Sequence, residues 1–289
     1  MSSSPTIFDR KLLRARQRRA RALGAETFLL DRVAEELGER LAPVLRSFER
    51  AADIGTPTDA VRRGLAASGK IGNIVGSGSI IIDEEALPFA DASLDLAVSA
   101  LSLQFVNDLP GTLIQIRRAL KPDGLLLAAL IGGDSLTELR EAFAEAESEI
   151  EGGVSPRVAP FADVRELGAL LQRAGFALPV VDSDRLTVRY PNVFALMNDL
   201  RRMGATNILV DRRRTPLKRA TLAKMVEIYT RRFADADGRL RATFEIAWLS
   251  GWTPHESQQK PLRPGSATHR LADALGAKEI STGEKPGES

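Results

Sequence analysis

The sequence predicts an α/β domain with a doubly wound, mainly parallel sheet, and three neighbouring segments carry that prediction. Leu94–Ala100 and Leu125–Ile131 are apolar runs with the length of buried strands. Between them, Asn107 and Asp108 supply an N-cap for a helix whose apolar side chains recur at helical spacing as far as Leu120. Strands without a polar face are typical of a parallel sheet that helices cover on both sides. The order strand, helix, strand therefore indicates an α/β fold.

Two helices are expected before the sheet. Phe8–Leu23 is strongly basic, with leucine and alanine as its apolar part, and Phe28–Leu41 places its apolar residues on one face. The basic helix either packs over one side of the domain with a solvated outer face or binds an anionic partner or a membrane surface. Residues 1–24 also have the serine-rich and arginine-rich composition of a mitochondrial transit peptide, with Asp9 as their only acid.

The first strand is expected at Arg50–Gly55, and the next stretch is unusual. Lys70–Ser79 is rich in glycine and serine and leaves little length for a normal strand, helix and further strand. We therefore expect an irregular connection there and the loss of one crossover helix. Ile80–Ile82 is a short β-branched run that ends at acidic residues, as a buried strand does at a polar rim.

The second half of the chain continues the alternation. Ser135–Ile150 and residues 163–175 are predicted helices, and Val180–Val188 and Thr243–Leu249 are predicted strands. The insertion at residues 192–238 is long enough for two or three helices. The expected division is N-terminal helices at 1–42, the main domain at 43–275 and a disordered tail at 276–289.

Composition excludes several classes of site. The 289 residues include no cysteine and two histidines, which excludes disulfides, thiol nucleophiles and a histidine-rich metal site, so we predict no metal ligands. The net charge of +2 does not predict a nucleic-acid partner. No apolar run approaches the ~20 residues that span a bilayer.

A family resemblance rests on the central motifs. Leu87–Phe89 after an acid, then Leu94–Ser99, then Arg117–Gly124 resemble the class I S-adenosylmethionine-dependent methyltransferases. The chain is most similar to the branch that holds the malonyl-carrier-protein methyltransferase of biotin synthesis and the methyltransferase-fold assembly factor of mitochondrial complex I. This resemblance implies a seven-stranded sheet and makes the insertion a helical lid over the substrate.

The resemblance also implies a site for S-adenosylmethionine. Asp53 and Gly55 match the end of the first strand and the glycine turn that follows it, where backbone N–H groups approach the ligand. Asp83 resembles the acid beside the adenine, and Glu84 and Ser99 complete the cofactor-binding candidates. No residue is implied as catalytic.

Two features of this cofactor site are missing. Residues 56–59 read Thr-Pro-Thr-Asp where further glycines are expected, and Pro57 lacks a backbone N–H. An acid for the ribose is expected ~20 residues past the turn, but no Asp or Glu occurs between Asp59 and Asp83. The sequence therefore predicts that S-adenosylmethionine binds weakly or not at all.

Two functions remain open. One is an S-adenosylmethionine-dependent methyltransferase, in which positioning and desolvation carry the reaction. The other is a non-methylating assembly factor or protein-binding relative, a branch that includes an arginine hydroxylase. The expected partner is a protein or an acyl-carrier substrate, and Arg212–Arg214 with Lys218 and Arg219 either form a solvated surface or contact an acidic partner.

The start of the chain also bears on the compartment. Residues 7–10, Ile-Phe-Asp-Arg, resemble the opening helix of the assembly-factor branch, so we favour a helix of the mature protein over a transit peptide. The expected location is the cytoplasm of a bacterium, with the mitochondrial matrix as the alternative.

Overall fold

A six-stranded sheet forms the centre of the computed structural model, which describes residues 6–76, 82–259 and 276. The strands are β1 (Phe48–Asp53), β2 (Ile71–Gly76), β3 (Leu94–Ala100), β4 (Leu120–Ile131), β5 (Ala177–Tyr190) and β6 (Leu240–Trp252). Their order is β2-β1-β3-β4-β6-β5, and only β6 of these six runs against the others. The predicted α/β fold with a mainly parallel sheet is confirmed, with six described strands instead of seven.

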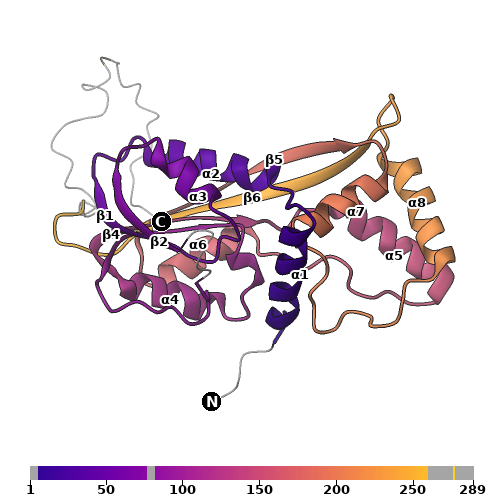
Figure 1. The fold of residues 1–289 in the computed structure, drawn as a ribbon, viewed down its shortest axis with the longest axis horizontal. Coiled ribbons are helices and arrows are strands. Elements are labelled where there is room, and N and C mark those ends of the chain that lie inside the picture. The colour runs from indigo at the N-terminus through magenta and orange to yellow at the C-terminus, as the bar shows by residue number, and fades with distance from the viewer. Residues whose placement is uncertain (1–5, 77–81, 260–275, 277–289) are drawn as a thin grey trace, which may run out of the picture. The chain divides into compact units, whose positions relative to one another are not determined.

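Helices cover both faces of this sheet (Figure 1). α2 and α3 pack on one face, and α4 and α6 pack on the other. The helices are α1 (Arg10–Ala22), α2 (Phe28–Leu41), α3 (Ala60–Ala66), α4 (Leu109–Ala119), α5 (Thr137–Glu151), α6 (Val164–Arg173), α7 (Val193–Arg202) and α8 (Arg219–Phe233), with a short 3₁₀ helix at Leu103–Phe105. The described helices and strands all lie in one unit, Met1–Pro254, and His255–Ser289 form a second unit. The domain boundaries predicted at 42 and 275 stay predictions.

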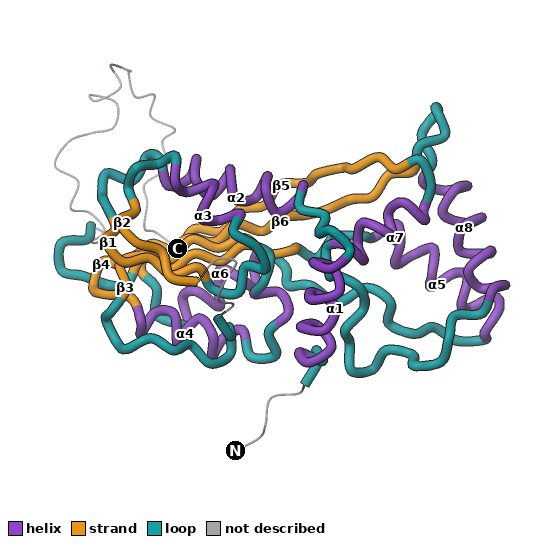
Figure 2. Tube along the Cα trace, in the orientation of Figure 1, coloured by secondary structure: helices purple, strands orange, loops and turns teal. Residues whose placement is uncertain are grey.

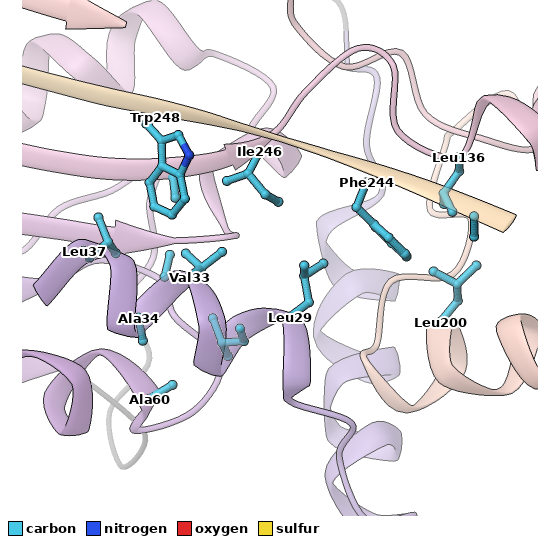
Figure 3. Packing of buried hydrophobic residues seen from close by; sticks show 14 of the residues in the cluster. Leu29, Val33, Ala34, Leu37, Ala60, Leu136, Leu200, Phe244, Ile246 and Trp248 are labelled. Carbon is cyan, nitrogen blue, oxygen red and sulfur yellow. The ribbon is translucent and has the colours of Figure 1, made fainter. Parts of the chain in front are cut away.

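Strand β4 shows why this stretch has no polar face. Leu125 and Leu127 belong to the core on the α2 side, whereas Leu126 and Leu130 belong to the core on the α4 side. Figure 3 shows the first of these cores, where Val33 and Leu37 of α2 lie under Ile246 and Trp248 of β6. Because successive side chains of a strand point to opposite faces, both faces must be apolar for both to be buried.

The predicted helices α4 and α6 each begin at an aspartate whose side chain caps the helix. The Asp108 carboxylate accepts a hydrogen bond from Gly111 N at 2.9 Å at the start of α4, and Pro110 lies in the first turn. The Asp163 carboxylate caps α6 in the same way, and Gly175 follows that helix with φ of +83°. The N-cap predicted for the helix after Asp108 is confirmed.

The prediction for Lys70–Ser79 was wrong over its first part. Residues 71–76 form the regular edge strand β2, parallel to β1, and helix α3 precedes it. Gly72 and Gly76 lie where a side chain would press on the backbone of β1, so glycine here permits close strand pairing. Residues 77–81, which include most of the strand expected at Ile80–Ile82, lie outside the described residues, and residues 82–93 contain no helix.

The long strands β5 and β6 extend beyond the rest of the sheet and carry the insertion (Figure 2). The insertion contains α7 and α8, as its length predicts, and α8 packs on α5. Arg213 and Lys218 form ion pairs with Glu151 at 3.0 Å and 2.7 Å, and Arg212 pairs with Asp9 at 3.2 Å. These three basic residues therefore bind within the chain.

The N-terminal segment is fixed by contacts of the residues that precede α1. The backbone N–H groups of Ile7 and Phe8 both donate to Asn107 Oδ1 at 2.8 Å, and Phe8 pairs with Leu209 of the insertion. The Asp9 carboxylate caps the helix through Leu12 N at 3.0 Å. Helix α1 thus connects the domain to the insertion. None of the helices in the described ranges is long and apolar enough to cross a membrane.

Candidate functional site

The candidate site lies where parallel strands end and α1 approaches the sheet. A pocket of about 960 Å³, part of it open to solvent, is lined by residues that follow three neighbouring strands. These residues are Pro57 and Thr58 after β1, Leu101 and Gln104 after β3, and Ser135 after β4. In open α/β sheets the carboxyl ends of the strands are the usual place for a ligand.

Three of the predicted site residues meet at the ends of β1 and β3. Asp53 is buried at the last position of β1, and Gly55 follows with φ of +78°, a conformation that favours glycine. Ser99 is buried in β3, and its hydroxyl donates to Ile54 O at 2.8 Å. The structure therefore brings Asp53, Gly55 and Ser99 together through one pair of neighbouring strands.

Glu84 fills the space beside Gly55. Glu84 is buried, and its Oε1 accepts a hydrogen bond from the Ser102 hydroxyl at 2.9 Å. A Cβ atom on Gly55 would collide with both of these side chains. Glycine at this position accordingly makes room for the chain's own carboxylate and hydroxyl.

Helix α1 supplies the counter-charge for these acids. Arg10 pairs with Asp83 at 2.8 Å and with Glu84, and its Nε lies 3.8 Å from Glu85. The Arg10 side chain is 12% exposed and that of Glu84 is 7% exposed, so this pair is almost removed from solvent. Together with Ser102, these residues are called the Arg10 cluster below.

Asp83 lies at the outer edge of the cluster. Its carboxylate also pairs with Arg14, one turn along α1 from Arg10, and it lines an open groove beside α1. Partial burial raises the pKa of Asp83, but hydrogen bonds from Arg14 and from Glu85 N and the charges of both arginines outweigh burial and hold that pKa below its usual value. Asp83 is thus an ionised group that faces a groove.

Sequence reasoning missed Arg10, Arg14 and Ser102. The available signal was the pairing of a basic helix without acids with a run of three acids at residues 83–85. The assignment of Asp53, Gly55, Asp83, Glu84 and Ser99 as cofactor contacts stays a prediction. Among the residues that the structure describes, no group of three or more His, Cys, Asp or Glu is placed to hold a metal ion.

The turn after β1 uses its polar groups within the protein. The Thr56 hydroxyl accepts a hydrogen bond from Ala100 N at 3.2 Å, and Thr56 is buried. Pro57 has no N–H to offer, and its carbonyl accepts from Arg21 at 3.4 Å. Strand β2 ends at Gly76, so this end of the sheet presents no carboxylate at the last residue of β2.

Comparison with known proteins extends over nearly the whole chain. Residues 52–128 match the family described as a methyltransferase domain. The chain is 39% identical over 295 residues to the mitochondrial arginine-hydroxylase NDUFAF5 of Rattus norvegicus, covering 94% of this chain and 85% of that protein. The same protein of Homo sapiens is 39% identical, with 92% and 84% covered.

Two further similarities cover less or show only the fold. A malonyl-acyl-carrier-protein O-methyltransferase of Xylella fastidiosa (strain M23) is 40% identical over 172 residues, covering 60% of this chain and 56% of that protein. The solved structure of the YcgJ protein from Bacillus subtilis is similar with a TM-score of 0.51 and 15% identity, covering 77% of this chain and 98% of that chain.

Proposed function

This chain belongs to the class I S-adenosylmethionine-dependent methyltransferase superfamily, in the branch of the arginine-hydroxylase NDUFAF5, and from that premise we propose that it is a non-methylating protein that binds a partner protein as an assembly factor does. One observation carries the proposal. The space beside Gly55, in the turn that the family resemblance assigns to the cofactor, holds the carboxylate of Glu84 and the hydroxyl of Ser102.

Displacing Glu84 from the space beside Gly55 costs more free energy than the remaining hydrogen bonds of the turn return to a ligand. A cofactor there displaces a carboxylate that is paired with a nearly buried guanidinium, and breaking such a pair costs about 3–5 kcal/mol. The N–H absent at Pro57 and the missing ribose acid remove about 1 kcal/mol or more each. Because about 1.4 kcal/mol is a factor of ten in affinity, these residues do not fit S-adenosylmethionine.

The extent of the similarity supports a role outside the cofactor turn. The methyltransferase-domain match ends at residue 128, whereas the similarity to the NDUFAF5 proteins covers 92–94% of the chain. Helix α1 lies before that domain match, and α7 and α8 lie after it. The proposal therefore places the function at α1 and the insertion, which serves as the lid of the site.

The charges around the central pocket favour partner binding over chemistry on an arginine. Arg21 and Arg202 line this pocket together with Glu26, and Glu26 is already paired with Arg202 at 3.3 Å. A guanidinium entering the pocket would meet net positive charge. An acidic partner suits this charge better, and an acyl-carrier protein is the second candidate because relatives with that substrate in their name match 60% of the chain. We place the protein in a bacterial cytoplasm, with the mitochondrial matrix as the alternative.

A melting experiment with S-adenosylmethionine tests the proposal. A ligand at 100 times its dissociation constant stabilises a protein by ~2.7 kcal/mol, and a domain of this size gains roughly 5–10 °C. We expect a shift below about 1 °C at ~0.1 mM cofactor, given the lost affinity. The Glu84→Ala variant, measured against its own ligand-free baseline, tests whether the carboxylate is the barrier. A shift of several degrees in the unaltered chain would return it to the methyltransferases.

A further inference from the structure

Three neighbouring depressions share lining residues, from the groove beside α1 to the pocket at the insertion, and together they are called the crevice below. A groove of about 790 Å³ between α1 and residues 82–84 shares Gln17 and Arg21 with the central pocket of about 960 Å³. The central pocket shares Phe105, Leu136 and Leu200, among others, with an inner pocket of about 950 Å³. A ligand that fills this crevice is therefore elongated.

The outer end of the crevice is basic. Helix α1 contains no acid, and Arg14, Arg18 and Arg21 all line the groove. Arg14 is paired with Asp83, but Arg18 is exposed and forms no ion pair with any residue in the described ranges. An acidic group on the ligand would find an unused guanidinium at this end.

The middle of the crevice offers unused amide groups. Gln104 Nε2 donates to Leu101 O at 2.8 Å, while the buried Gln104 Oε1 has no hydrogen-bond partner in the described structure. Gln17 lines the same pocket, and its side chain makes no hydrogen bond to the residues that the structure describes. A side-chain amide offers both a donor and an acceptor, which matches the paired N–H and C=O of a peptide backbone. The buried acceptor suits an N–H or O–H donor on a ligand.

The inner end is apolar. Leu139, Phe143 and Leu217 line it, and the nearby Arg157 is held by Glu147. Apolar side chains gain about 25 cal/mol for each Å² that they bury in such a place. The crevice thus changes from basic, through amide-bearing, to apolar along its course.

We propose that this crevice binds an extended segment of the partner protein, with acidic residues beside α1 and apolar residues under the insertion. The proposal rests on the proposed function, since it identifies the segment by which that partner is recognised. An acyl chain satisfies the apolar end but brings no N–H for Gln104. A basic segment meets Arg18 and its neighbours with like charge.

Selection from a displayed library of random peptides tests this inference on the full chain. Peptides of about ten residues reach ~33 Å when extended, enough to follow a crevice of several side chains. We expect the selected peptides to carry Asp or Glu at one end and Leu, Val or Phe at the other. The best peptide, labelled with fluorescein, is then titrated by fluorescence anisotropy at low and high salt, and affinity falls with salt because the groove is open to solvent.

Matched variants locate the binding. Arg18→Ala is expected to weaken the peptide two- to fivefold, roughly what an exposed ion pair contributes. Gln104→Leu is expected to weaken it by about fivefold through the lost hydrogen bond. Arg19→Ala is the control, since Arg19 is also exposed on α1 but lines none of the three depressions. Circular dichroism melting checks that each variant is folded.

Four outcomes of the peptide experiments would overturn the inference. No enrichment, enrichment of basic peptides, or equal losses in the Arg18 and Arg19 variants would show that the crevice does not read an acidic and apolar segment. Displacement of the peptide by dodecanoate, with tighter binding of dodecanoate, would make the crevice an acyl-chain site. If peptide selection fails and S-adenosylmethionine also fails to bind, the non-methylating role stands and only this site falls. If S-adenosylmethionine binds and the peptide selection also succeeds, the peptide site stands and the non-methylating role falls.

Discussion

Replacing Arg10 with methionine removes the guanidinium that faces Glu84 and keeps an unbranched apolar side chain in its place. The two side chains are 12% and 7% exposed, so water screens their interaction poorly. Without Arg10, the Glu84 carboxylate keeps the Ser102 hydroxyl as a partner but loses its buried counter-charge. Asp83 keeps Arg14.

The expected cost follows from that burial. Removing one partner of a buried ion pair costs about 3–5 kcal/mol, because the other charge stays buried without compensation. Each kcal/mol corresponds to ~2–4 °C in a domain of this size, so Arg10→Met should lower the melting temperature by roughly 6–20 °C. The matched control is Arg14→Met on the same helix, whose side chain is 51% exposed. An exposed pair contributes about 0–1 kcal/mol, so this control should fall by at most ~4 °C.

Thermal and urea denaturation of five chains measures the effect. The set is the unaltered protein, Arg10→Met, Glu84→Gln, the double variant of these two, and the Arg14→Met control. We expect the double variant to be more stable than the sum of the single losses predicts, by about 1–3 kcal/mol, because neither charge is then left alone. Equal small losses for Arg10→Met and Arg14→Met, or strictly additive single losses, would refute the view that the Arg10 cluster is a buried, mutually dependent unit.

Two further predictions concern the insertion and β6. Hydrogen bonds from Lys218, then Thr221, lower the pKa of Glu151 to about 2 from 4.5, so its stabilising effect is present above about 4.5 and is lost as pH falls towards 2. The melting-temperature difference between the unaltered chain and Glu151→Gln should shrink over that interval, and a constant difference would contradict it. The buried Tyr229 hydroxyl donates to Arg241 O at 2.7 Å, so Tyr229→Phe should cost about 1 kcal/mol, or ~2–4 °C, in the same melting assay. A fall above ~10 °C would show that the hydroxyl does more than this bond.

Local patterns predicted the elements that are buried on both faces. The apolar run of β4 and the Asp108 cap of α4 both lie within short stretches of sequence, and both were recognised. The edge strand β2 was missed because its exposed side places glycine and polar residues where a buried strand has apolar ones. The stability of β2 comes from backbone pairing with β1. Gly72 and Gly76 permit this close pairing, but glycines in a sequence do not by themselves predict a strand.

The candidate site was predicted only as far as its local motifs reach. The acids that follow residue 82 were recognised as a rim, but the partner of Glu84 is Arg10, 74 positions earlier. Ser102 belongs to no motif, and its role appears only once β1 and β3 lie side by side. Spatial pairing between distant segments is decided by the fold as a whole, which a local pattern does not contain.

The attachment of α1 has a consequence for the order of events during synthesis. Asp9 meets Arg212 across 203 positions of sequence, and Phe8 pairs with Leu209. A ribosome adding ~5–20 residues each second needs ~10–40 s to make the segment that receives this helix. During that interval helix α1 has been made, but the residues of the insertion that it contacts have not. The outer wall of the crevice is therefore completed only after β1, β3 and β4, whose ends line the central pocket, have been made.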